Sequence, residues 1–280
     1  MYHVTLRGNH QQAIFFTATD RVRMNDLFAE GVERFDARLH AYCYMTNHLH
    51  ALVQVADTPL GALMRRVGGQ YARMTQARLE TTGHLFEKRY HQVLVDTDAY
   101  LRELVRYIHL NPVRAGLASL PSEYPWTSHH AYLGRRHEPW VTTDFALSQF
   151  SPHRDHAVKA YEIFLGQTPV ATSPLDARNP SDSRILGDDD FARRMLGSEW
   201  KPRSRKSLDQ LVAESCKNFS VTERDLRSPR RDAKIVAARA WVANEAIEGR
   251  IASVAAVARM FNRNESSLRR ALGRRTAQPE

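Results

Sequence analysis

The sequence contains little cysteine, no long apolar run and no histidine beyond residue 156. Its two cysteines, Cys43 and Cys216, lie far apart and form no CxxC pair, which excludes a disulfide framework and a cysteine-based zinc site. No stretch is apolar enough to span a membrane, and "MYHVTLRGNH" at the N-terminus lacks the apolar core of a secretion signal. We therefore expect a cytoplasmic protein with reduced thiols and no membrane partner.

Charge is distributed unevenly along the chain, whose net charge is +9. Residues 198–280 contain 18 Lys and Arg against 10 Asp and Glu, whereas the preceding residues contain 22 against 21. A local excess of basic residues favours a polyanionic partner such as nucleic acid. A basic tail can also serve solubility alone, but this one is patterned like a folded module. All 13 histidines lie in the other part of the chain, so metal or proton chemistry is expected there.

The first 110 residues alternate between strand and helix patterns. Period-two and 3.6-residue periodicities predict strands at 2–6, 40–45, 48–55 and 84–95, and helices at 20–35, 57–79 and 96–110. We expect Thr58 to cap the second helix, Asp96 or Asp98 to open the third, and Pro112 to follow its end. The order βαββαβα predicts an α+β fold with a ferredoxin-like split βαβ core, an antiparallel sheet and helices on one face.

Three regions are expected beyond this pattern of elements. Residues 111–134 are rich in proline and aromatic residues and are expected to wrap back on the sheet, which gives a first domain at 1–134. Residues 135–206 are expected to be a helical extension followed by a linker, because 167–206 carry Pro, Ser and Asp without periodicity. Residues 207–280 are expected to form an all-α helix-turn-helix module.

The stretch "MTNHLHALV" at 45–53 places two histidines in an apolar strand. Side chains two apart on a strand point to the same face, so His48 and His50 present two imidazoles together. Two neutral imidazoles at this spacing can hold one divalent cation. The pair alone is weak evidence, because a histidine in a strand is often a structural residue with satisfied hydrogen bonds.

A second pattern lies at the end of the third helix, in "YIHLNPV" (107–113). Tyr107 and Asn111 are four residues apart and therefore share a helix face. A phenol can act as a nucleophile and an amide oxygen can bind a metal. The alternative is a core tyrosine followed by an asparagine that ends the helix before proline.

The motifs together resemble the single-tyrosine HUH transposases, and more narrowly the REP-associated tyrosine transposases. The resemblance covers residues 2–134 and rests on "YHVTLRGN", "AIFF", "AYCYMTNHLHALV", "GHLFEKRYHQVLV", "YIHLNPVRAGL" and "YPWTSHHAYLG", in this order. Thr46 stands where that family often has proline.

The resemblance implies a function and a role for each residue. Tyr107 is the catalytic nucleophile, and His48, His50 and Asn111 bind Mg²⁺ or Mn²⁺. The implied enzyme is a transposase that nicks and rejoins single-stranded or hairpin DNA through a 5′-phosphotyrosine intermediate, at repetitive extragenic palindromes that form hairpins. It would act as a monomer or a homodimer.

The basic C-terminal stretch resembles the DNA-binding domain of the bacterial replication initiator DnaA. "DLRSPRRDAKIVAARAWVANE" (225–245) is similar to its basic loop and long helix, but "NESSL" (264–268) replaces its recognition signature, so its sequence specificity is not carried over. On the expected recognition helix Leu268 and Leu272 face the core. We expect duplex DNA to be contacted by Arg230, Arg231, Ser266, Ser267, Arg269 and Arg270. A plain helical bundle with surface arginines is the alternative.

Two further basic residues, Lys88 and Arg89, lie on the expected fourth strand and are candidates for phosphate contacts, although a solvated strand face explains them equally well. Two other functions stay open. The chain can be a non-catalytic regulator that recognises repeats, or an HxH metallohydrolase of small molecules, although the latter lacks further ligands at suitable positions.

Overall fold

The computed structural model describes residues 1–167, 173–197, 206–249 and 251–275. The chain divides into two compact units, one of residues 1–179 and 183–188 and the other of residues 180–182 and 189–280. The domain limits expected at 134 and 206 stay predictions. Among the described helices, none combines the length and the apolar character that crossing a membrane requires.

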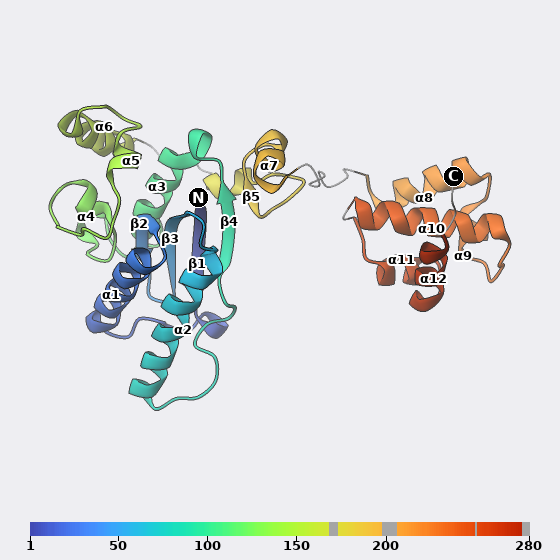
Figure 1. Cartoon of the computed structure of the whole chain (residues 1–280), viewed down its shortest axis with the longest axis horizontal. Coiled ribbons are helices and arrows are strands. Elements are labelled where there is room, and N and C mark those ends of the chain that lie inside the picture. Colours follow the sequence, from blue (N-terminus) through green and yellow to red (C-terminus); the bar gives the residue numbers. More distant parts are fainter. Residues whose placement is uncertain (168–172, 198–205, 250, 276–280) are drawn as a thin grey trace. The chain divides into compact units, whose positions relative to one another are not determined.

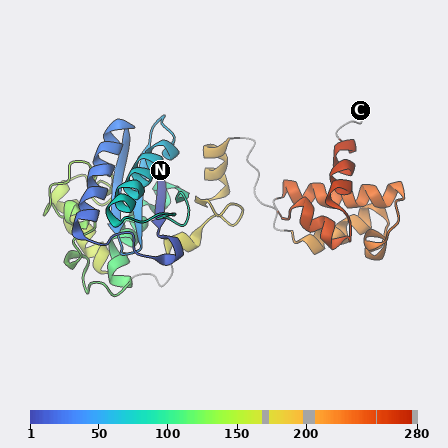
Figure 2. The ribbon, with the colours of Figure 1, turned by 90° about the horizontal axis from the view of Figure 1, so that it is seen from below.

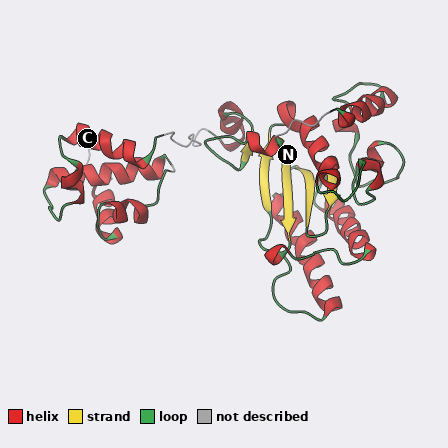
Figure 3. Cartoon of the chain, turned by 180° about the vertical axis from the view of Figure 1, so that it is seen from behind, coloured by secondary structure: helices red, strands yellow, loops and turns green. Residues whose placement is uncertain are grey.

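The first unit is built on a five-stranded sheet (Figure 1, Figure 3). Its strands are β1 (Tyr2–Arg7), β2 (Ala37–Tyr44), β3 (His48–Val55), β4 (His91–Val95) and β5 (Ile185–Leu186), in the order β2-β3-β1-β4-β5. β1 pairs antiparallel with β3 and β4, β2 pairs antiparallel with β3, and β5 is parallel to β4. The expected α+β class and the order βαββαβα are confirmed, although β5 makes the sheet mixed.

Helices cover both faces of the sheet, so the expectation of helices on one face is wrong. Ala51 and Val53 of β3 share a core with Phe28 of α1 (Ala18–Arg34) and with residues of α2 (Leu60–Leu79). Leu52, which points the other way, packs in a second core with Leu104 of α3 (Thr97–Arg114). Figure 2 shows α1 and α2 side by side on their face. The second face of β3 carries His48 and His50, so the sequence gives little sign that a helix covers this face as well.

The first two helices begin with different signals. Thr17 caps α1 in a capping box with Asp20, and Arg78 of α2 forms an ion pair with Asp20 at 2.7 Å. The cap of α2 is Pro59, not Thr58, and no side chain accepts a hydrogen bond there. The ring of Pro59 fixes the backbone angle φ at the start of the helix, so the chain enters α2 in a defined direction without a side-chain cap.

The fourth strand is shorter than expected, because residues 84–90 precede β4 instead of forming part of it. β1 pairs with β4 only from Tyr2 to Thr5, although β1 continues to Arg7 in its pairing with β3. Only an isolated bridge between Gly8 and Phe86 continues the pairing. Lys88 and Arg89 therefore lie on an irregular segment.

α3 continues through Pro112, which was expected to follow its end. Pro112 lies in the last turn, where it has no N–H to bond the Ile108 carbonyl, and the helix ends two residues later at Arg114. The chain leaves the helix at Gly116, whose φ of +68° suits glycine. Asp96 is the N-cap residue, without a side-chain hydrogen bond.

Residues after α3 fold back on the sheet as expected. They form η2 (Pro121–Glu123), α4 (His129–Tyr132), α5 (Asp144–Leu147) and α6 (Arg154–Gly166). Ser128 accepts a hydrogen bond from the backbone N–H of Tyr42 in β2. His109 of α3 lies 2.7 Å from both the Ser128 hydroxyl and the Tyr161 hydroxyl of α6, and all three side chains are buried. These contacts join α3 to α6 and to the segment before α4, so His109 has a structural role.

The stretch expected to be a linker contains regular structure in its described part. Residues 173–197 form η3 (Pro174–Ala177), β5 and α7 (Asp189–Leu196). Asn179 donates a side-chain hydrogen bond to the carbonyl oxygen of Gly187 beside β5. Residues 168–172 and 198–205 lie outside the described residues.

The second unit contains, after α7, the helices α8 (Leu208–Phe219), α9 (Glu223–Arg227), α10 (Ala233–Glu248), α11 (Val254–Met260) and α12 (Glu265–Arg275). Ser207 caps α8 in a capping box, as expected. Val242 of α10, Phe261 and Leu268 of α12 are buried in one core. Residues 261–264 join α11 to α12, and Asn262 adopts a left-handed conformation there, with φ of +51°.

Candidate functional site

His48 and His50 lie next to each other on β3, on the face that α3 covers. Their ring centroids are 4.9 Å apart and the rings stand edge to face. His50 is 5% exposed and His48 is half-buried. β3 is paired on both sides, by β1 and β2, so the backbone that carries the two rings is held firmly. The expectation that they share a face agrees with this geometry.

Both imidazoles are neutral at neutral pH. Burial lowers the pKa of His48 to about 4, and the positive charge of Arg7 adds to this effect. Burial lowers the pKa of His50 well below its usual value, with further contributions from His3, His48 and Arg7. A neutral imidazole keeps a nitrogen lone pair that can bind a cation.

Tyr107 reaches the same place from α3. Its ring centroid lies 5.6 Å from that of His50, with the ring planes at 83°. The guanidinium carbon of Arg114, two turns further along α3, lies 5.2 Å from the centroid of the Tyr107 ring. Tyr107 is half-buried, so its side chain stays accessible. The structure thus brings the Tyr107 phenol and the Arg114 guanidinium of α3 close to the imidazole pair of β3, from segments about 60 residues apart in the sequence.

Asn111 lies one turn beyond Tyr107. Its side-chain N–H donates to the Tyr107 carbonyl oxygen at 2.8 Å, which leaves the amide oxygen as its available ligand atom. Among the described residues, Asn111 forms no hydrogen bond with either histidine. The described part of the chain also contains no cluster of three or more His, Cys, Asp or Glu side chains that could hold a metal ion. A cation at this site would therefore depend on two imidazoles and an amide.

His3 belongs to the site, although the sequence analysis did not select it. It lies on β1, is 1% exposed, and its Nε2 atom is 3.0 Å from Nδ1 of His50. The two rings are stacked with centroids 5.1 Å apart, and Tyr107 stands edge-on to His3 at 6.3 Å. Burial lowers the pKa of His3 to about 3. In the sequence, His3 could have been noticed as a histidine between apolar residues of an expected strand.

The hydrogen bonds of the two histidines on β3 fit a cation-binding role. The Asn47 side-chain oxygen lies 2.7 Å from His48 Nδ1 and can only accept, so His48 Nδ1 carries the proton and Nε2 keeps its lone pair. His50 Nε2 is free in the same way when Nδ1 donates to His3 Nε2. Partners of this kind orient metal-binding imidazoles in proteins. The Nδ1 atom of His3 is buried and has no hydrogen-bond partner among the described residues.

The basic candidates on the first unit lie on the segment before β4. Lys88 and Arg89 are exposed, and neither forms an ion pair within the described residues. They face a groove beside α2 rather than the histidine pair.

The expected contacts on the second unit are also exposed. Leu268 is 3% exposed and anchors α12, while its neighbours point to solvent. Arg269 forms an ion pair with Glu265 at 2.6 Å. Over residues 265–272 of this helix, the exposed residues are Ser266, Ser267, Arg269 and Arg270.

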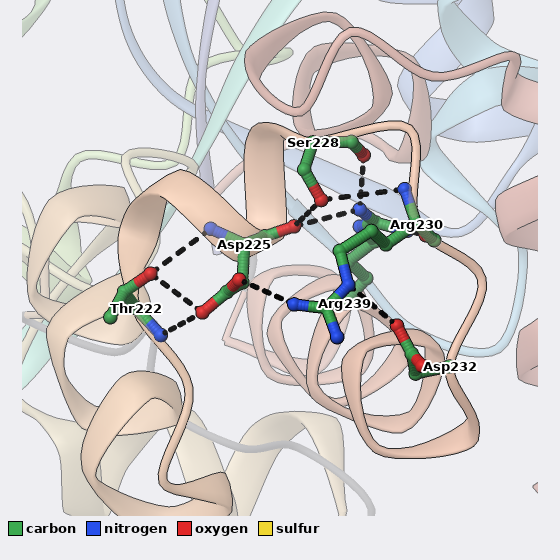
Figure 4. A network of polar contacts seen from close by, with 6 residues as sticks. All are labelled: Thr222, Asp225, Ser228, Arg230, Asp232 and Arg239. Carbon is green, nitrogen blue, oxygen red and sulfur yellow. Dashed lines mark hydrogen bonds and ion pairs between the residues drawn. The ribbon is translucent and has the colours of Figure 1, made fainter.

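A buried arginine shapes the basic loop before α10 (Figure 4). Arg239 of α10 is 4% exposed and donates hydrogen bonds to four backbone carbonyl oxygens, those of Asp225, Leu226, Ser228 and Arg230. The sequence analysis did not select Arg239, because a basic residue in a basic stretch gives no sign of burial.

The two arginines of this loop differ. The Arg230 side chain forms ion pairs with Asp225 at 3.3 Å and Asp232 at 3.0 Å. Arg231 is exposed and forms no ion pair within the described part of the chain. Arg231 is therefore the freer of the two cations for a partner.

Comparisons with known proteins give two matches. Residues 1–111 match the family model described as transposase IS200 like. A solved structure of a REP-associated tyrosine transposase bound to a REP hairpin is 17% identical, with a TM-score of 0.41, and the alignment covers 50% of this chain and 84% of that chain. No curated protein matches the sequence.

Proposed function

We propose that the first unit, which carries the IS200-like transposase pattern over residues 1–111, cuts and rejoins single-stranded DNA with Tyr107 as the nucleophile. The observation that carries this proposal is the meeting of the Tyr107 ring with His50, at 5.6 Å between centroids. A structural histidine pair would not need an accessible phenol beside it.

The reaction is a phosphoryl transfer in two steps. The Tyr107 hydroxyl oxygen attacks a phosphorus atom of the strand, the bond from phosphorus to the 3′-oxygen breaks, and the leaving oxygen takes up a proton. The protein is then joined to a 5′-phosphate. A second 3′-hydroxyl attacks the same phosphorus and releases the phenol, so the bond energy is conserved for rejoining.

A divalent cation, Mg²⁺ or Mn²⁺, would be held by Nε2 of His48, Nε2 of His50 and the amide oxygen of Asn111. Such a cation polarises a phosphoryl oxygen and stabilises the charge of the transition state. The chain itself supplies orientation, because β3 fixes the imidazoles and α3 fixes the phenol. Arg114 adds a positive charge beside the ring, where the phosphate must approach.

We propose hairpin-forming repeats as the target, on the basis of the motifs that resemble REP-associated tyrosine transposases. The second unit would add contacts to duplex or flanking DNA through α12 and the basic loop, where exposed serine and arginine side chains gather. Tyr107 and the histidine pair of one chain already lie together, which supports catalysis within a single chain.

The test uses the full chain, Mn²⁺ and single-stranded DNA that carries hairpins. Tyr107→Phe should form no covalent protein–DNA adduct on a denaturing gel, while its DNA affinity stays within about twofold of wild type. Tyr100→Phe, a matched change on the same helix, should form the adduct normally.

Two results would count against this function. Adducts at the wild-type level in Tyr107→Phe would remove the nucleophile assignment. DNA binding without any adduct in the wild-type protein, across a set of repeat hairpins, would favour a non-catalytic regulator instead.

A further inference from the structure

A groove of about 1000 Å³ lies between α2 and residues 83–92, away from the histidine pair. The histidine pair faces α3, whereas α2 covers the opposite face of the sheet. The proposed chemistry makes no use of this groove.

Small residues make up much of the α2 wall of the groove, beside Met64, Arg65 and Gln76. Gly61, Gly68, Gly69 and Ala72 line it, and these positions fall on one side of the helix. A Cβ on Gly61 would come no closer than 3.4 Å to the Tyr90 hydroxyl, and one on Gly69 would meet only the Arg73 side chain at 3.5 Å. Packing therefore does not require glycine at 61 or 69, and glycine lowers helix stability. Glycine at these two positions therefore leaves the groove open and lowers the stability of α2.

The charge in the groove is mainly positive. Arg65 of α2 faces the groove from one side, and Lys88 and Arg89 face it from the other. All three are exposed, and none forms an ion pair within the described residues. Glu87 is the one acidic residue among those that line the groove.

Two aromatic side chains, Phe86 and Tyr90, line the same groove and are half-buried. Proteins that bind single strands without reading their sequence use two kinds of side chain. Cationic side chains follow the phosphate backbone of the strand, and bases stack on aromatic rings. A duplex hides the faces of its bases and could not use the rings.

We propose that this groove binds a single-stranded segment of the DNA substrate, through Arg65, Lys88 and Arg89 on phosphates and Tyr90 on a base. This inference rests on the proposed function, since it assigns part of the same substrate to a second place on the first unit. The groove binds backbone and base faces, and the histidine pair with Tyr107 carries the chemistry.

The main experiment compares two triple variants of the full chain. One is Arg65→Ala, Lys88→Ala and Arg89→Ala. The control removes the same charges from exposed residues outside the groove, with Arg34→Ala, Arg38→Ala and Lys159→Ala. The probe is a fluorescent oligothymidylate in EDTA, where no chemistry occurs, and the readout is anisotropy over a range of salt concentrations.

The groove variant should bind the probe on the order of 10-fold more weakly, and the slope of log affinity against log salt should become shallower by about 2. The control should keep the wild-type affinity and slope. Equal losses in the two variants, or no loss in either, would overturn the proposal. A groove variant that loses as much affinity for a blunt duplex as for the single strand would also overturn it.

The stacking role is tested at one position. Tyr90→Leu should weaken probe binding by roughly 10-fold, whereas Tyr90→Phe should bind like wild type, because the ring is what stacks. Equal binding by the two variants, with unchanged thermal midpoints, would overturn the role of Tyr90. Gly69→Leu fills the groove without changing charge, and should weaken single-strand binding while the helix gains stability.

The inference and the proposed function can fail separately. A protein that forms the Tyr107 adduct, but whose groove variants bind the probe normally, has no single-strand site in the groove. A protein that binds the probe through the groove, but never forms an adduct, has the site without the chemistry.

Discussion

His50 makes ring contacts with three side chains, His3, His48 and Tyr107, and this makes it the central residue of the site. Its Nδ1 atom is occupied by His3, so only Nε2 can face a cation or a phosphate. A side chain from β1 thus determines which nitrogen of a β3 histidine is available.

His3 should matter for cation binding although it does not touch the cation. His3→Leu removes the acceptor for His50 Nδ1–H and should weaken Mn²⁺ binding, measured by calorimetry, by about 10- to 100-fold. His3→Gln offers an amide oxygen in its place and should lose much less. His40→Gln, a change at another buried histidine of the same unit, should leave the affinity unchanged. Equal affinity in His3→Leu and wild type would contradict this role.

Acid should destabilise the first unit through these histidines. The folded-state pKa of His48 is about 4 and that of His3 about 3, both below the value of about 6.5 for histidine in an unfolded chain. The unfolded chain therefore binds more protons below pH 6.5, and the free energy of unfolding falls as the pH drops from 6.5 toward 4. The thermal midpoint of this unit should fall over that window.

A variant isolates the contribution of one histidine to this acid effect. His3→Gln should show a shallower loss of thermal midpoint between pH 6.5 and 4, whereas His84→Gln, at an exposed position, should follow the wild-type curve. Identical curves for His3→Gln and wild type would contradict the buried, neutral state of His3.

The sequence predicted part of this site well, for a physical reason. The shared face of His48 and His50, and that of Tyr107 and Asn111, follow from the periods of strand and helix. His3 could not be found in this way, because its contact with His50 depends on pairing between strands 47 residues apart. Periodicity carries no information about which strands become neighbours.

At the scale of the elements, α10 and the loop before it depend on Arg239. The helix buries this guanidinium and directs it at the carbonyl oxygens of the basic loop (Figure 4). Arg230 and Arg231 of this loop are exposed. The fold of the loop therefore depends on the helix that follows it.

Removing this arginine should unfold the loop and destabilise the second unit. Arg239→Met leaves four carbonyl oxygens without their donor, and should lower the free energy of unfolding of this unit by about 2–4 kcal/mol. Arg259→Met, at an exposed position on α11, should change it by less than about 0.5 kcal/mol. Hydrogen exchange at the backbone amides of α10, followed at increasing urea concentration, measures both. Similar effects from the two changes would show that Arg239 does not support the loop.

The elements that the sequence misplaced have local causes. The strand expected at 84–95 forms only over His91–Val95, and β1 pairs with it no further than Thr5 although β1 itself continues to Arg7. The helix expected to stop before Pro112 continues to Arg114, so Pro112 lies in its last turn and removes one hydrogen bond there, the one to the Ile108 carbonyl. Both errors concern where an element ends, which depends on neighbours as much as on sequence.

At the scale of the whole molecule, β5 shows what composition cannot predict. Residues 185 and 186 lie in a stretch rich in Ser and Asp, yet they add a parallel strand beside β4. Such a short strand has no periodicity of its own and forms because an edge of the sheet is available.

Catalysis within one chain has a direct consequence for mixtures of variants. His50→Ala lacks the imidazole and Tyr107→Phe lacks the phenol, so neither should form an adduct alone. Their equimolar mixture should also form none if, as proposed, Tyr107 acts with the histidine pair of its own chain, to which it lies close. An adduct in the mixture near a quarter of the wild-type level, the share of intact sites when two kinds of chain pair at random, would show that partner chains exchange Tyr107.

The most direct measurement is to map the covalent product of the full wild-type chain with Mn²⁺ and single-stranded DNA that carries repeat hairpins. Protease digestion and mass spectrometry should find a 5′-phosphate joined to Tyr107, and the released strand should end in a 3′-hydroxyl. A product joined to any other residue, or a strand cut with no protein attached, would contradict the account.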